Sequence, residues 1–261
     1  MLSKLLKNDL KKNMRWMWIL FVSTIGVALL TRGTKELGKE IAFFTVIGVI
    51  FEGAFYGLVI NSIIQPFLRN FLNFHRSFYS DESYLTHTLP VTKNQLITSK
   101  YLTTVIEICI GFATIIISLL IAYAKPGFLD TLKLLLSTII SGDFSIWLLI
   151  IFVVLLIIVE FLMFISIIYF SIVIAFRSKD KRILKTFIIA AAMAFASITT
   201  LSIALLVVML LNGVDISSST LVLSSTALYS IIITGIVIYS AITLLFYFLT
   251  KHEFNKGVNV D

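Results

Sequence analysis

The sequence predicts an all-α, polytopic membrane protein with six transmembrane helices. Hydrophobic residues make up 59% of its 261 residues and charged residues only 13%, whereas soluble domains average roughly 45–50% apolar and about 25% charged residues. The mean hydropathy is +1.02. Only three prolines interrupt the apolar runs, so these runs can form helices long enough to span a bilayer, which takes about 17–25 residues.

The first predicted element is an amphipathic helix at the membrane interface, over residues 1–15. At about 3.6 residues per turn, its leucines fall on one side and its basic residues on the other. The basic side contains Lys4, Lys7, Lys11, Lys12 and Arg15. A disordered basic tail is the alternative, but disorder does not require this spacing.

Six apolar windows follow, and we expect each to span the membrane. They cover residues 16–31, 41–64, 101–124, 146–176, 186–211 and 228–249. The first is short, but no cleavage site of small residues follows it, so we interpret it as a retained span rather than a signal peptide.

The segments that connect the apolar windows differ in their predicted structure. Residues 70–100 contain a polar island between two apolar windows, and residues 128–140 are too short to span and predict a short helix at the outer surface. The Ser-rich stretch 214–225 predicts a loop or a shallow re-entrant segment. Cys109 lies within an apolar run, where a lone cysteine is expected to be a small buried hydrophobe.

The basic residues predict the orientation of the spans. With the N-terminus inside, sixteen of the 21 Lys and Arg residues fall on the cytoplasmic side, as the positive-inside rule requires. The even number of spans then places both termini in the cytoplasm. The net charge of +7 is therefore a topology signal, and we expect no nucleic-acid partner.

No enzymatic motif is present. Residues 33–40 match the G-x-x-x-x-G-K part of a phosphate-binding loop, but Glu40 stands where a Ser or Thr must bind magnesium. His75, His87 and His252 lack metal-ligand spacing. We therefore expect neither an enzyme nor a bound metal or cofactor, and any ATP and Mg²⁺ would have to be bound by a partner.

Three carboxyl groups lie within the predicted spans, at Glu52, Glu107 and Glu160. A charged side chain at the centre of a span costs roughly 2.5–3.5 kcal/mol on insertion scales, so each should face protein or a wet cavity. A polar contact on a substrate path, a proton relay and an inter-helix hydrogen bond are all open for Glu52 and Glu160. For Glu107, near one end of its span, we favour the hydrogen bond.

One stretch carries a family resemblance. Phe78 to Glu82, Tyr84 to Thr86, Thr88 to Thr92, Leu96 and Ser99-Lys100 resemble the loop between the second and third spans of type-2 ABC exporter permeases, peptide exporters above all. The resemblance is strongest over residues 70–105 and architectural elsewhere. It implies that residues 1–261 form one transmembrane domain of this type.

In that family the loop forms a coupling helix that sits in a groove of a separate ATPase. The resemblance implies two ATPase copies and a second permease, identical or related. Large side chains and charges suit such docking, and Pro90 would end a short helix over residues 81–87 and keep the loop rigid. The implied coupling residues are Tyr79, Ser80, Asp81, Glu82, Tyr84, Leu85, Thr88 and Pro90.

The resemblance also implies the mechanism, which is ATP-driven export across a bacterial plasma membrane. The family's architecture would place Glu52, Asn61 and Ser62 on the substrate path, and Glu160 is a further candidate from its position within a span. Short outer loops suit an amphipathic cargo, such as a bacteriocin, a lantibiotic or a membrane-active toxin.

Two other functions remain open. A proton-coupled secondary transporter could use Glu52 and Glu160, but it predicts internal repeats and broken helices, and the sequence has neither a repeat nor a proline in the middle of a predicted span. A non-transporting sensor or immunity subunit would have the same membrane layout.

Overall fold

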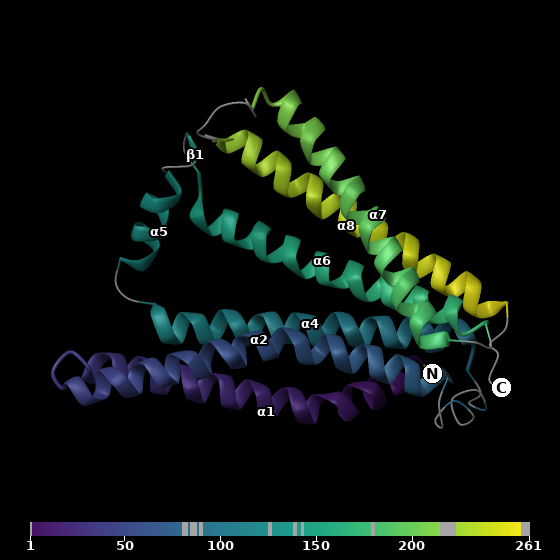
Figure 1. The fold of residues 1–261 in the computed structure, drawn as a ribbon, viewed down its shortest axis with the longest axis horizontal. Helices are drawn as coiled ribbons and strands as arrows, with labels where there is room; N and C mark the ends of the chain where they lie inside the picture. Colours follow the sequence, from purple (N-terminus) through teal and green to yellow (C-terminus); the bar gives the residue numbers. More distant parts are fainter. Residues whose placement is uncertain are drawn as a thin grey trace. The chain divides into compact units, whose positions relative to one another are not determined.

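The computed structural model of the chain describes residues 2–79, 83, 88, 91–124, 127–137, 140–141, 144–178, 181–214 and 223–256. Its helices are α1 (Leu2–Leu37), α2 (Ala42–Tyr79), α4 (Lys93–Tyr123), α5 (Phe128–Ser137), α6 (Ile146–Ala175), α7 (Arg182–Leu211) and α8 (Ser225–Asn255), and its strands are β1 (Ile140–Ser141) and β2 (Leu223–Ser224). Figure 1 shows these elements in chain order.

Six of the helices, all except α5, are long and apolar enough to cross a membrane. Each predicted window lies within or coincides closely with one of them, so the all-α, six-helix prediction is confirmed. Many large apolar side chains on these helices are exposed, such as Val49, Phe195 and Leu211. Such faces are expected where lipid tails replace water as the surrounding solvent.

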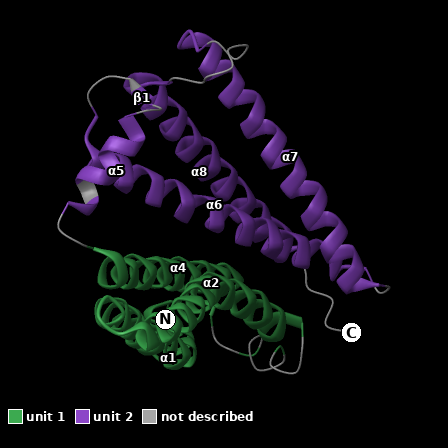
Figure 2. Ribbon diagram, turned by 60° about the vertical axis from the view of Figure 1, so that its left-hand side comes forward, with its two compact units in different colours: residues 1–126 green, residues 127–261 purple. Residues whose placement is uncertain are grey.

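The chain divides into two compact units, residues 1–126 and 127–261 (Figure 2). In the first unit, α1, α2 and α4 pack against one another. Their shared apolar core includes Ala28, Phe55 and Ala122. The three helices alternate in direction, so the start of α1, the end of α2 and the start of α4 lie at the same end of the unit.

Two helix boundaries differ from the sequence prediction. α1 continues without a break through residues 2–15 into the first predicted span, so no separate N-terminal helix is present. α2 continues beyond the predicted span 41–64, through Pro66, and ends at Tyr79. Proline has no N–H, so the carbonyl of Ser62 loses its usual helical donor at this point.

α4 approaches α2 closely at that carbonyl. A Cβ atom on Gly111 of α4 would lie 3.1 Å from the Ser62 carbonyl oxygen. A glycine Cα–H at such a position can make a weak contact with a carbonyl oxygen. The close approach of α2 and α4 therefore depends on the absence of a side chain at Gly111.

The second unit is built on α6 and α8, with α7 packed against both. Its main core cluster contains Met163, Ile167, Phe170, Tyr239 and Phe246. Gly235 of α8 faces Leu156 of α6 so closely that a Cβ would come within 2.8 Å of the leucine Cδ1 atom. α7 buries only Thr186 and Ser197 among its residues, and its other side chains are at least partly exposed.

The connecting segments were predicted with mixed success. α5 confirms a short helix within residues 128–140. Within the stretch 214–225, residues 215–222 lie outside the described part, and β2 pairs in parallel with β1 through Ile140 with Leu223 and Ser141 with Ser224. The expectation for Cys109 is wrong, because this residue is exposed on the surface of α4.

Candidate functional site

The base of the predicted coupling loop is held by regular helix ends. α2 ends at Tyr79, which is half-buried, and α4 begins at Lys93. Thr92 caps α4, because its hydroxyl accepts a hydrogen bond from the Gln95 N–H while the Gln95 side chain accepts one from the Thr92 N–H. This reciprocal capping box satisfies two backbone donors that a helix start leaves unpaired.

Most of the loop itself lies outside the described residues. This applies to the predicted coupling residues Ser80, Asp81, Glu82, Tyr84, Leu85 and Pro90. Of the predicted set, Tyr79 and Thr88 are described, and Thr88 is exposed. Near the loop, burial and then the neighbouring Arg76 lower the pKa of His75.

A buried polar cluster joins the three helices of the first unit near this loop. We call it the polar clamp, and it consists of Asn13 of α1, Asn70 and Asn73 of α2, and Thr104 and Glu107 of α4. Glu107 is at its centre and is only 1% exposed. One carboxylate oxygen accepts a hydrogen bond from Asn13 at 2.6 Å, and the other accepts one from Asn70 at 2.8 Å.

Further hydrogen bonds join other polar atoms of the clamp. Asn70 donates to the Pro66 carbonyl at 2.8 Å and accepts from the Thr104 hydroxyl at 2.8 Å. Asn73 donates to the Asn13 side-chain oxygen at 2.9 Å. A buried polar group without a partner costs about 1–3 kcal/mol, so the network favours one arrangement of the three helices.

A second contact lies one turn further toward the N-terminus. Asp9 of α1 forms an ion pair with Lys100 of α4 at 2.8 Å and accepts a hydrogen bond from Ser99 at 3.1 Å. Both residues of the ion pair are largely buried, with 15% and 18% of their side chains exposed. The first turns of α1 are therefore attached to the start of α4, directly after the predicted coupling loop.

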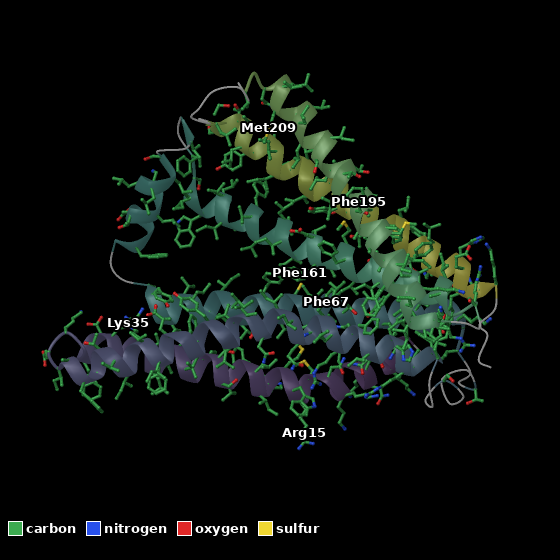
Figure 3. All side chains as sticks on the ribbon, in the orientation of Figure 1. Arg15, Lys35, Phe67, Phe161, Phe195 and Met209 are labelled. Carbon is green, nitrogen blue, oxygen red and sulfur yellow. The ribbon has the colours of Figure 1, made fainter. Side chains whose placement is uncertain are left out.

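The predicted membrane-facing basic residues lie on the other side of α1. Lys4, Lys7, Lys11, Lys12 and Arg15 are all exposed, while the leucines at positions 2, 5, 6 and 10 are half-buried. In Figure 3, Arg15 points away from the rest of its unit. The prediction of a separate amphipathic helix at the membrane surface is not supported, because residues 2–15 belong to the long helix α1 and their leucines are partly covered by protein.

Glu52 lies at the opposite end of the first unit, in a cluster that we call the end lock, with Lys35, Tyr56 and Tyr123. One oxygen of its carboxylate accepts hydrogen bonds from Lys35 at 2.6 Å, Tyr123 at 2.7 Å and Tyr56 at 3.3 Å. The Lys35 ammonium also lies 4.5 Å from the centre of the Tyr123 ring. α1, α2 and α4 are therefore joined at this end as well.

The other candidates for the substrate path are not gathered around Glu52. Ser62 is buried, lies 3.5 Å from the Thr24 hydroxyl and donates to its own helix at the Leu58 carbonyl. Asn61 is half-buried. Glu160 belongs to the second unit, where it interacts with the Tyr239 hydroxyl of α8.

The hydrogen bonds answer part of the question that the sequence left open for the carboxyl groups. Glu107 makes inter-helix hydrogen bonds, as expected. Glu52 and Glu160 also contact neighbouring helices. Sequence reasoning missed the other members of the polar clamp, although Asn70 and Asn73 are three residues apart and therefore share one face of a helix.

The described residues contain no group of three or more His, Cys, Asp or Glu side chains placed to hold a metal ion. Comparison of the chain with protein-family models, with curated proteins and with solved structures gave no match. The site therefore has to be interpreted from its own geometry.

Proposed function

We propose that this chain is the permease subunit of an ATP-driven exporter, with a separate ATPase docking on residues 79–90. The single observation that supports this most is the polar clamp, because it joins the two helices flanking this loop to each other and to α1. A loop on such a base can pass a displacement to three helices together. If the flanking helices were not joined, a displacement of the loop would move one helix without the others.

In this proposal the ATPase contacts the large side chains and charges of the loop and closes when it binds ATP. The resulting movement passes through the clamp into α1, α2 and α4. The exposed basic side of α1 suits contact with anionic lipid headgroups, where each Lys or Arg near the surface contributes about 1 kcal/mol. Both termini lie in the cytoplasm, and two permeases and two ATPases form the working complex in a bacterial plasma membrane.

The cargo in this proposal is amphipathic, and a peptide fits best. The chain has little polar mass outside its apolar helices, which suits a substrate that is taken directly from the membrane or its surface. Substrate residues would come from Glu52, Asn61, Ser62 and Glu160. Three of these, Glu52, Ser62 and Glu160, have inter-helix partners and would contact cargo only after rearrangement.

Co-purification tests the proposal. The chain is expressed with the ATPases of its host, and a nucleotide-binding subunit should be retained by the unaltered protein. Tyr84→Ala or Leu85→Ala should reduce the retained ATPase at least about tenfold, because large buried anchors contribute most of an interface's energy, roughly 2 kcal/mol or more each.

The matched control is Leu134→Ala, which removes an exposed leucine from α5, far along the chain from the loop. It should leave ATPase retention unchanged. Retention that survives both loop substitutions would contradict the docking site. Solute transport by vesicles that contain only this chain would contradict the proposal as a whole and favour a secondary transporter.

A further inference from the structure

A pocket lies beside the end lock, between the end of α1 and the start of α2. Its volume is about 300 Å³, and its lining consists of Lys35, Gly38, Lys39, Phe44, Thr45, Gly48, Val49 and Glu52. This is at the lower end of the roughly 300–1,000 Å³ range of small-molecule sites. The lining combines two ammonium groups, one carboxylate and an apolar wall.

The two polar clusters of the first unit indicate where the bilayer lies. Glu52 of the end lock and Asn70 of the polar clamp are separated by 18 residues of α2, or about 27 Å at 1.5 Å per residue. Glu107 and Tyr123 of α4 are 16 residues apart, or about 24 Å. The hydrocarbon core of a bilayer is about 30 Å thick, so the clusters lie near its two boundaries.

Contacts between α1 and α2 support this placement. Thr24 lies beside Ser62, Asn13 beside Asn73 and Lys35 beside Glu52. The apolar segment 16–31 of α1 therefore lies opposite roughly residues 55–70 of α2. The turn between α1 and α2 and the pocket beside it then lie near the membrane boundary, within reach of the lipid headgroups.

The polar atoms of the pocket are only partly used within the protein. Lys35 carries three N–H groups, and within the described residues its ammonium donates a hydrogen bond to one oxygen of Glu52. The other oxygen of Glu52 has no hydrogen-bond donor among the described residues. Lys39 pairs with Glu36 three residues earlier, and both are exposed, so this pair contributes little stability and leaves the ammonium available.

We propose that this pocket binds the headgroup of a phospholipid that carries a primary ammonium group. Its phosphate would accept hydrogen bonds from Lys35 and Lys39, and its ammonium would donate to the free oxygen of Glu52. Its acyl chains would extend into the hydrocarbon layer along the exposed side chains of Tyr56, Ile60 and Ile64, which follow one another at every fourth position of α2. This inference rests on the membrane placement and is independent of the ATPase.

Lipid retention by the purified full-length chain tests the proposal. The delipidated protein receives equal amounts of phosphatidylethanolamine and phosphatidylcholine with the same acyl chains, and native mass spectrometry measures the bound lipid. The primary ammonium group of phosphatidylethanolamine has N–H donors, whereas the quaternary ammonium group of phosphatidylcholine has none. We expect a preference for phosphatidylethanolamine of about tenfold, the size that one charge-assisted hydrogen bond supplies.

Two substitutions separate the roles of the pocket residues. Lys39→Ala should weaken retention of both lipids, because it removes a phosphate donor and leaves the end lock intact. Glu52→Gln should remove the preference between the lipids. Lys133→Ala, an exposed lysine of α5, is the matched control and should change neither result.

Three outcomes would overturn the proposal. The first is equal retention of the two lipids by the unaltered chain. The second is unchanged retention after Lys39→Ala, which stays informative even if Glu52→Gln fails to fold. The third is displacement of the lipid by equimolar glycerophosphoethanolamine, since a site that binds the soluble headgroup equally well is not a lipid site.

Discussion

Asn70 has an unusual number of roles for one side chain. It donates to Glu107 and to the Pro66 carbonyl, and it accepts from Thr104. It therefore pairs the central carboxylate of the clamp and also supports the helix just after its proline. Loss of this side chain would remove the hydrogen-bond donor of one buried carboxylate oxygen of Glu107.

We predict that Asn70→Ala destabilises the protein by roughly 1–3 kcal/mol, the cost of leaving buried polar groups unpaired. Unfolding in mixed detergent micelles measures this change. Asn61→Ala on the same helix is the matched control, because Asn61 is half-buried and has no hydrogen-bond partner among the described residues. Equal losses from the two substitutions would show that the clamp contributes no special stability.

At the scale of elements, the packing of α2 against α4 depends on a proline on one helix and a glycine on the other. Pro66 deprives the Ser62 carbonyl of its helical donor, and Gly111 brings α4 up to that carbonyl. The two features are 45 residues apart in the chain. A local sequence pattern therefore cannot predict that these two positions lie side by side.

Gly111→Leu should separate α2 from α4 and destabilise the first unit by about 1–3 kcal/mol, the usual cost of overpacking. Thermal unfolding of the purified chain is the measurement. Gly53→Leu is the control, since a Cβ at Gly53 meets nothing within 4 Å. If Gly111→Leu were as harmless as the control, the helices could not be in close contact at this point.

On the scale of the whole molecule, the main determinant is the distribution of charge along an apolar chain. The basic residues gather in the first turns of α1, at the end of α2 and the start of α4, and from the end of α6 to the start of α7. The positive-inside rule relates this bias to the side of the membrane. The orientation of the chain is thus a prediction from charge, and it needs a measurement in a membrane.

We predict that single cysteines in a Cys109→Ser background will report the orientation. Ser3→Cys and Asn255→Cys should react with a membrane-impermeant maleimide only after the cells are opened. Lys39→Cys, in the turn between α1 and α2, should react in intact cells. Reaction of Ser3→Cys in intact cells would reverse the predicted topology.

Cys109 itself illustrates how a local pattern misleads. An apolar run in a soluble protein predicts a buried residue, but in a membrane-spanning helix the apolar face toward lipid is exposed on the surface of the protein. Hydropathy therefore locates the helices without deciding which of their faces meet. The same limit explains why α7 is strongly apolar and yet buries few side chains.

Length and hydropathy were enough to predict the helical class, the six long apolar helices and the short helix before the fourth of them. Length and hydropathy are local properties, and a bilayer requires continuous helices of a set length. The contacts between polar residues of different helices could be read only from the packed helices. Asn13, Asn70 and Glu107 come from three helices, and their contacts depend on the register of packing, which arises from long-range fit and not from local composition.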